Sequence, residues 1–152
     1  MVGSILVVCI GNVCRSPVGE RLLRAALPGL SISSAGLHAM SGAPADPDTE
    51  AVAAARGLAL DGHIARQFTP AIGAAHELIL VMEAAHRREL AQIAPHLSGR
   101  TLLYGQWLNG GTDIPDPYRR SLATQDQTFQ LIRESAQGWI ARVARKDPGS
   151  AS

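Results

Sequence analysis

Several classes of protein are excluded by what this chain of 152 residues lacks. Its 2 cysteines are too few for the disulfide framework of a small secreted domain. Lys and Arg number 14 against 13 for Asp and Glu, so the chain lacks the basic excess of a dedicated nucleic-acid or membrane-surface binder. The apolar run at residues 5–10 has no basic flank or cleavage site and is too short to cross a membrane. We therefore expect a soluble cytoplasmic protein.

Hydrophobic residues make up 46% of the chain, and short apolar runs typical of buried strands alternate with segments of helical periodicity. Strands are expected at residues 5–8, 30–35, 78–82 and 101–104. Helices are expected between Pro17 and Pro28, between Pro47 and Gly57, and at residues 83–94 and 123–145. This order predicts a three-layer α/β sandwich, with a short parallel sheet of about four strands flanked by helices. One domain is expected over residues 1–146, followed by a disordered tail at 147–152.

The most specific motif follows the first expected strand. Cys9, Arg15 and Ser16 form the pattern C-x5-R-S between a buried strand and a helix that begins near Pro17. Ligands of open parallel sheets bind beyond the carboxyl ends of the strands. A sharp turn there directs backbone N–H groups and a helix dipole at one anion, so we expect a phosphate-binding loop. The residues of this expected loop are Ile10, Gly11, Asn12, Val13, Cys14, Arg15 and Ser16.

Each residue type in this loop suits one task. Arg15 offers a planar fork that matches two phosphate oxygens. Cys9 lies where a positive field favours the thiolate, which is a nucleophile for phosphorus, although a lone Cys is most often a small buried side chain. Gly11 is expected to bend the backbone where a side chain would clash. Ser16 could cap the helix or donate a hydrogen bond to the thiolate, and the sequence does not distinguish the two.

A thiolate that displaces an oxygen needs an acid to protonate that oxygen as it leaves. Asp113 and Asp116, in the long loop at residues 105–120, are the two candidates. Asp116 lies between two prolines, Pro115 and Pro117, which restrict its backbone and help to fix its side chain. Aspartate is also common in ordinary turns. The residues alone therefore leave a catalytic Asp116 and a turn Asp116 open.

Taken together, these segments resemble those of the low-molecular-weight protein tyrosine phosphatases. The similar segments are V-C-I-G-N-V-C-R-S-P at 8–17, S-A-G at 34–36, G-H-I-A-R at 62–66, L-I-L-V-M-E at 78–83 and D-P-Y at 116–118. The resemblance runs from Ile5 to Val143. The motifs I-P-D-P-Y-R and G-Q-W are most similar to those of the bacterial Wzb-like branch. That branch is associated with tyrosine kinases of capsule and exopolysaccharide export.

The resemblance implies a phosphatase I-like fold and hydrolysis of protein phosphotyrosine through a cysteinyl-phosphate, without metal or cofactor. It implies Cys9 as the nucleophile, Arg15 as the phosphate clamp and Asp116 as the general acid. Four residues would brace the loop: Asn12, Ser16, Ser34 and His63. Two residues would form walls beside the substrate ring: Met40 and Tyr118. Cys14 would form a protective disulfide with Cys9 or be a small buried filler.

The expected partner is a phosphotyrosine protein, in particular the cytoplasmic domain of a bacterial tyrosine kinase, and the chain is expected to be a monomer or weak dimer. A thioredoxin-type arsenate reductase shares the loop but uses further cysteines, and none follows Cys14. A phosphotyrosine-binding module without turnover is the alternative from another class, although such a module usually lacks the nucleophile or the acid. The 5 histidines form no H-E-x-x-H motif, and His86 is expected on a solvated helix face.

Overall fold

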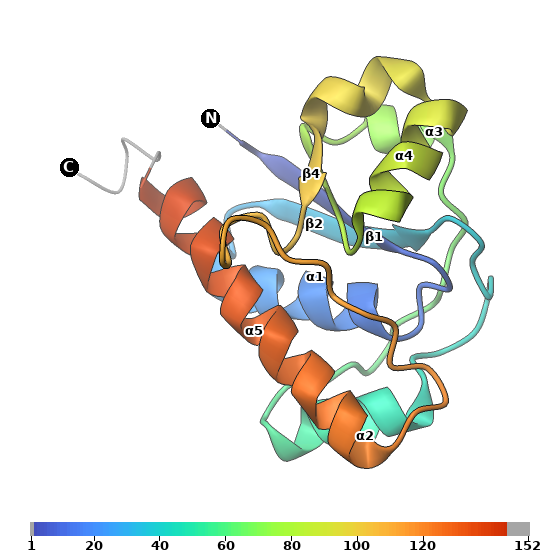
Figure 1. The fold of residues 1–152 in the computed structure, drawn as a ribbon, viewed down its shortest axis with the longest axis vertical. Helices are drawn as coiled ribbons and strands as arrows, with labels where there is room; N and C mark the ends of the chain where they lie inside the picture. The colour runs from blue at the N-terminus through green and yellow to red at the C-terminus, as the bar shows by residue number, and fades with distance from the viewer. Residues whose placement is uncertain (1, 146–152) are drawn as a thin grey trace.

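The centre of the fold is a parallel sheet, seen in the computed structural model, which describes residues 2–145 (Figure 1). Its strands are β1 (Ser4–Cys9), β2 (Ser31–Gly36), β3 (Leu78–Val81) and β4 (Thr101–Leu103). They lie in the order β2-β1-β3-β4, and every neighbouring pair is parallel. The predicted short parallel sheet is therefore confirmed. The expected boundary at residue 146 and the tail at 147–152 lie outside the described residues.

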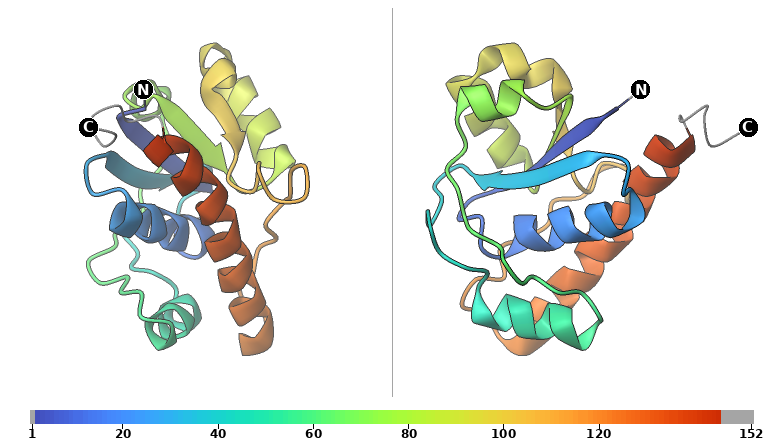
Figure 2. Two further views of the ribbon diagram at one scale, coloured as in Figure 1. Left: turned by 90° about the vertical axis from the view of Figure 1, so that its left-hand side faces the viewer. Right: turned by 180° about the vertical axis from the view of Figure 1, so that it is seen from behind.

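Helices cover both faces of this sheet (Figure 2). One face packs against α1 (Arg15–Ala26) and α5 (Leu122–Arg145). The other packs against α3 (Pro70–Ala74), α4 (Ala84–Ile93) and the 3₁₀ helix η1 (Pro95–Arg100). A further helix, α2 (Pro47–Ala55), contacts α5 away from the sheet. None of the helices over residues 2–145 combines the length and the apolar character needed to cross a membrane.

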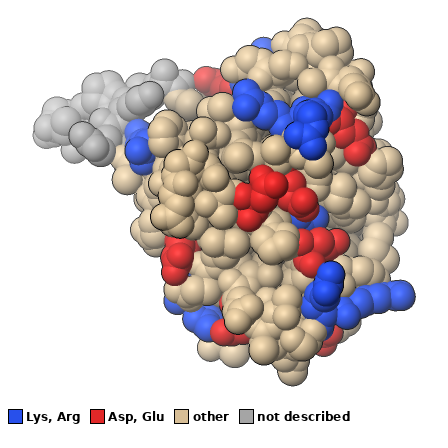
Figure 3. All heavy atoms as spheres, in the orientation of Figure 1, with Lys and Arg blue, Asp and Glu red and all other residues tan. Residues whose placement is uncertain are grey.

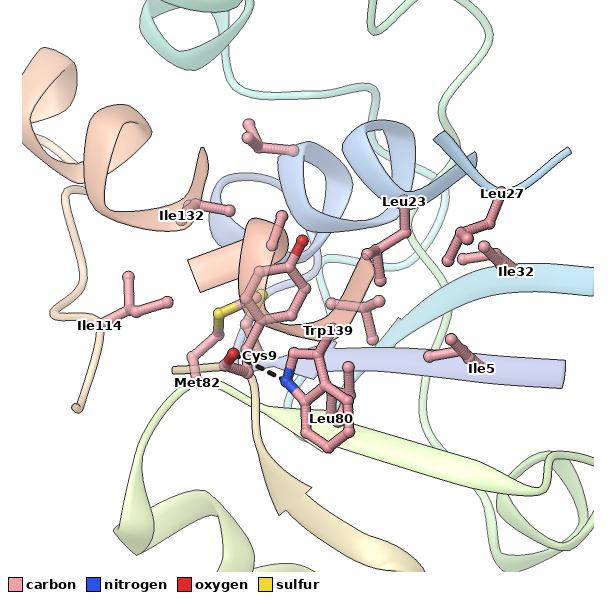
Figure 4. Close-up of a cluster of buried hydrophobic side chains, with 14 of the residues drawn as sticks. Ile5, Cys9, Leu23, Leu27, Ile32, Leu80, Met82, Ile114, Ile132 and Trp139 are labelled. Carbon is pink, nitrogen blue, oxygen red and sulfur yellow. Dashed lines mark hydrogen bonds between the residues drawn. The ribbon is translucent and has the colours of Figure 1, made fainter. Parts of the chain in front are cut away.

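The strands form because their side chains are apolar on both sides, as a sheet between two helical layers requires. Ile5 and Val7 of β1 belong to the core under α1 and α5, while Leu6 and Val8 belong to the core under α4. Figure 4 shows the first of these cores, in which Trp139 of α5 reaches the sheet. Its indole nitrogen donates to the backbone oxygen of Tyr104 at 2.9 Å. Packing and this hydrogen bond fix α5 against β1 and β3.

Two short helices, α3 and η1, are missing from the sequence prediction. Neither is longer than six residues, so neither produces a clear apolar period. Local signals for α3 are nevertheless present, because the Thr69 hydroxyl accepts from the Ile72 N–H at 3.2 Å and Pro70 is the first helical residue. Neither helix lies in the connection between β1 and α1.

Charge is mixed over the surface, as the near-balance of the composition predicts. In Figure 3 acidic and basic side chains are interspersed on the face viewed in Figure 1, without a continuous field of either sign. This face therefore gives no sign of the extended basic surface that nucleic-acid binding requires.

Candidate active site

The expected loop lies at the carboxyl end of β1, one of the two central strands. Cys9 is the last residue of β1 and Arg15 the first of α1, and both side chains are buried. A pocket of about 180 Å³ opens beside them. Its lining residues are Cys9, Ile10, Gly11, Val13, Cys14, Arg15, His38, Met40, Asp116 and Tyr118. The fold thus brings the expected nucleophile, clamp, acid and both wall residues to one pocket, and adds His38.

The Ser16 hydroxyl faces the expected nucleophile rather than a helix end. Its Oγ lies 2.9 Å from Cys9 Sγ, whereas α1 begins at Arg15 and has no side-chain cap. The amide of Asn12 donates to the same Oγ at 2.7 Å. Because that oxygen already accepts one hydrogen bond, its own proton is free to point at Sγ. This chain of hydrogen bonds directs the Ser16 hydroxyl proton at the Cys9 sulfur.

Asn12 joins the loop to the rest of the fold. Its backbone has φ of 58°, a left-handed conformation that asparagine tolerates better than most residues. Its side-chain amide also donates to Ser34 Oγ at 3.0 Å, and its Oδ1 accepts from the Arg66 N–H at 3.0 Å. His63 Nε2 lies 2.6 Å from the Asn12 carbonyl oxygen. Three of the four residues expected to brace the loop, Ser16, Ser34 and His63, therefore all contact the fourth, Asn12.

The expected role of Gly11 is wrong. A Cβ at Gly11 would lie 3.6 Å from Val13 Cγ2, which is ordinary van der Waals contact, and its φ is not in the left-handed region. Asn12 carries the unusual backbone angle instead. The glycine that the loop does require is Gly36 at the end of β2, where a Cβ would lie 2.4 Å from the carbonyl oxygen of Ile10.

Glu20 extends the brace and was not predicted. The Ser34 hydroxyl donates to Glu20 Oε1 at 2.9 Å, and Arg21 and Arg24 each donate to Oε2 at 3.1 Å. The carboxylate is buried, and these three donors compensate its charge. Glu20 follows Ser16 by four residues, so both lie on the same face of α1. That spacing was the available signal in the sequence.

Replacing Asn12 with alanine should lower the free energy of unfolding by about 2–4 kcal/mol, because it leaves several buried hydrogen-bonding groups without partners. Urea unfolding followed by circular dichroism measures the change. Asn109→Ala is the matched control, since Asn109 is exposed and has φ of 50°. Equal losses in the two variants would mean that backbone strain, and not the brace, explains the effect.

Arg15 is held by one of its terminal nitrogens. Its Nη1 donates to Glu83 Oε2 at 2.5 Å and to the Ile114 carbonyl oxygen at 2.8 Å. Its Nε has no hydrogen-bond partner within residues 2–145, and Nη2 lies 3.9 Å from Asp116 Oδ2. Nε and Nη2 form one edge of the guanidinium plane. That edge is the one available to donate hydrogen bonds to two oxygens of a phosphate.

Glu83 and His86 are a second pair that the sequence did not indicate. His86 is 4% exposed, so its expected place on a solvated helix face is wrong, and its Nε2 lies 3.4 Å from Glu83 Oε2. Burial, followed by the nearby Arg15 charge, lowers the pKa of His86, which is therefore neutral at pH 7. The long loop lies against the start of α4, where Asp113 accepts from the Ala84 N–H. Glu83 thus sits between a neutral imidazole and the guanidinium of Arg15.

The two candidate acids occupy different places. Asp113 Oδ1 accepts from the Ala84 N–H at 3.0 Å, which caps the first turn of α4. Asp116 is half-exposed at the pocket, where its Oδ1 accepts from the Tyr118 N–H at 3.0 Å. A half-exposed carboxyl group at the mouth of the pocket can exchange protons with a bound molecule and with water. The geometry therefore favours Asp116 over Asp113 as the acid.

Both thiols are free in this structure, and they differ in surroundings. Burial raises the pKa of the Cys14 thiol to about 12, so Cys14 stays protonated at physiological pH. Iodoacetamide at pH 7.5 should therefore alkylate Cys9 and leave Cys14 unmodified, since the thiolate is the reactive form. Peptide mass spectrometry of wild type and Cys9→Ser measures this. Alkylation of Cys14 at a rate equal to that of Cys9 would contradict the assignment.

Within residues 2–145 the structure contains no group of three or more His, Cys, Asp or Glu side chains arranged to hold a metal ion. The polar groups at the pocket are instead those of an anion site: a buried guanidinium edge, a helix N-terminus and a thiol.

Known proteins are similar to this chain along most of its length. A family model described as "Low molecular weight phosphotyrosine protein phosphatase" matches residues 4–148. The low molecular weight protein-tyrosine-phosphatase Etp of Escherichia coli K12 is 45% identical over 142 residues, which cover 93% of this chain and 95% of Etp. The tyrosine phosphatase Wzb of Escherichia coli K30, crystallised with sulphate, has a TM-score of 0.92 at 44% identity over 94% of this chain and 99% of Wzb. Vibrio vulnificus Wzb in complex with benzylphosphonate has a TM-score of 0.90 at 44% identity over 93% and 99%. The chain therefore belongs to the low-molecular-weight protein-tyrosine phosphatases.

Proposed function

We propose that the chain hydrolyses phosphotyrosine in proteins through a phosphate ester of Cys9. The observation that carries the proposal is the shared pocket of Cys9, the free edge of Arg15 and the half-exposed Asp116. A nucleophile, a phosphate clamp and an acid are the groups that transfer of a phosphoryl group to sulfur needs. Sulphate in the Wzb of Escherichia coli K30 and benzylphosphonate in that of Vibrio vulnificus support an anion pocket with room for an adjacent ring.

In the first step the Cys9 thiolate attacks phosphorus in line with the leaving oxygen. The sulfur–phosphorus bond forms, the bond from phosphorus to the tyrosine oxygen breaks, and Asp116 gives its proton to that oxygen. Arg15 Nε and Nη2, with the N–H groups of the loop, hold the three equatorial oxygens, over which the transition-state charge is spread. The Ser16 hydroxyl, 2.9 Å from Sγ, orients the thiolate before it attacks.

In the second step water replaces sulfur on phosphorus. Asp116, now a carboxylate, takes a proton from the attacking water, and the sulfur–phosphorus bond breaks to release inorganic phosphate. The departing thiolate again accepts from Ser16, which makes it a better leaving group. Asp116 regains its proton in this step and is ready for the next substrate. The scheme uses no metal ion or cofactor.

We further propose a substrate class. Met40 and Tyr118 form the two walls beside the substrate ring, since both line the pocket above Cys9. Similarity to Wzb, together with the association of that branch with export kinases, supports the phosphorylated cytoplasmic domain of a bacterial tyrosine kinase as the partner. The proposed location is the cytoplasm, where such a domain is accessible, and the proposed state is a monomer or weak dimer.

The proposed function is tested with a phosphotyrosyl peptide and its phosphoseryl counterpart, each assayed under reducing conditions with EDTA. Release of phosphate from the phosphotyrosyl peptide at a rate that EDTA does not change is the expected result. Turnover of arsenate by a thioredoxin-coupled assay, with no phosphate release from either peptide, would favour the reductase instead. Tight binding of the phosphotyrosyl peptide without turnover would favour a binding module.

A further inference from the structure

A second hollow lies next to the active-site pocket. It has a volume of about 170 Å³ and runs between the loop that joins β2 to α2 and the segment that follows Asp116. Its lining is mainly apolar and includes Met40, Ala43, Pro44, Pro47 and Tyr118. The proposed chemistry of phosphate hydrolysis uses none of this groove beyond the two walls of the pocket.

The groove and the active-site pocket adjoin each other. Val13, Met40 and Tyr118 line both of them. Tyr118 packs against the small buried cluster that contains Val13, and the hydrogen bond from its N–H to Asp116 ties its position to that of the acid. A substrate whose phosphotyrosine enters the pocket therefore has its neighbouring residues at the entrance of the groove.

The groove is held in shape by backbone hydrogen bonds to the phosphate loop and its brace. The Met40 N–H donates to the Gly11 carbonyl at 3.0 Å, and the Asp46 N–H donates to the Val13 carbonyl at 2.9 Å. The Ala65 N–H donates to the Ala43 carbonyl at 2.9 Å. A preformed groove costs little ordering on binding, so apolar contact within it adds directly to affinity.

Size and chemistry identify the occupant. The groove volume of about 170 Å³ is close to the 180 Å³ of the pocket proposed for phosphotyrosine, so it has room for one large side chain. Pro44 and Pro47 are exposed and offer no N–H donors, which leaves an apolar surface for the occupant to cover. In an extended peptide, residues two apart point to the same side at a spacing of about 7 Å.

We propose that this groove is a specificity subsite for a large apolar or aromatic side chain two residues from the phosphotyrosine of the substrate. The inference rests on the proposed phosphotyrosine hydrolysis. It goes beyond that function by defining which phosphotyrosine sites the enzyme prefers. The phosphate group fixes the register of the peptide, and the groove binds the side chain two residues away.

The test compares phosphotyrosyl peptides of equal charge that carry phenylalanine or serine at position −2 or +2. Phenylalanine at one of these positions should raise kcat/KM about tenfold over serine, because one side chain fills an apolar pocket. Pro44→Glu, which puts a charge at the exposed rim of the groove, should bring that ratio close to one. Gln92→Glu adds the same charge on an exposed position of α4 and should keep the ratio.

The wild-type series decides the proposal even if Pro44→Glu folds poorly. Equal kcat/KM for phenylalanine and serine at both positions overturns the subsite, as does a preference that Pro44→Glu retains. Hydrolysis of para-nitrophenyl phosphate, which has no neighbouring residues, is measured in parallel. If the peptides show no such preference, while wild type hydrolyses para-nitrophenyl phosphate and Cys9→Ser does not, the phosphatase function stands and the subsite alone is wrong. If wild type hydrolyses neither it nor any peptide, the proposed function fails and the subsite fails with it.

Discussion

Replacing Cys9 with serine should abolish hydrolysis of para-nitrophenyl phosphate, with a fall in kcat of roughly 10⁴-fold or more. A serine hydroxyl at the end of β1 would be neutral at pH 7 and a far weaker nucleophile than a thiolate, and its neighbour Ser16 is a hydroxyl that cannot take its proton. The substitution changes one buried atom, so the fold and the anion site should persist. Steady-state kinetics, with thermal unfolding of each variant, measures both effects.

Cys14→Ser is the matched control for this prediction. Cys14 is also buried and lies in the same loop, but its thiol is protonated because burial raises its pKa to about 12. Under reducing conditions Cys14→Ser should therefore keep most of the activity. Activity that survives in Cys9→Ser and is lost in Cys14→Ser would reverse the assignment of the nucleophile.

Replacing Asp116 with asparagine should lower kcat by about 10²–10⁴-fold, the usual contribution of a general acid. The loss of kcat/KM, which reports the first step, should be larger for phenyl phosphate than for para-nitrophenyl phosphate, because the more basic phenolate depends more on protonation as it leaves. Asparagine keeps the shape of the side chain and can still accept from the Tyr118 N–H. Steady-state kinetics with the two esters therefore isolates the loss of the acid proton.

Asp113→Asn is the control, because Asp113 caps α4 while Asp116 lines the pocket. Asparagine is also a good capping residue, so this variant should keep both its stability and its kcat. An equal loss of kcat in the two variants, or a loss of kcat/KM in Asp116→Asn that does not depend on the leaving group, would contradict the role of Asp116.

The positions of the strands and the place of the site follow from the sequence because both rest on local patterns. Runs such as residues 5–8 and 78–82 are apolar on both faces, which is typical of strands between two helical layers. Once the sheet is parallel, the carboxyl end of the first strand is the expected ligand edge, and Cys9 and Arg15 are already next to it. The boundaries moved by one or two residues, and α1 begins at Arg15 rather than after Ser16.

The partners that complete the site depend on contacts far apart in the chain. Glu83 is 68 residues from Arg15, and nothing near Glu83 in the sequence shows that its carboxylate meets that guanidinium. Arg87 and Arg88 beside it favour a solvated face for His86, yet His86 is buried. The backbone of the loop comes close to Gly36 and not to Gly11, because the close contact is between the ends of β1 and β2. Such packing is visible only in three dimensions.

The central claim, that Cys9 carries the phosphoryl group during turnover, is tested by trapping it. Wild type is mixed with para-nitrophenyl phosphate, quenched in acid within the first turnovers and digested, and the peptides are examined by mass spectrometry. Asp116→Asn is treated in the same way, because loss of the base for the second step should make the intermediate accumulate. The account predicts phosphate on the peptide that contains Cys9 and on no other. Rapid phosphate release with no phosphopeptide in either protein, or phosphate on another residue, would contradict it.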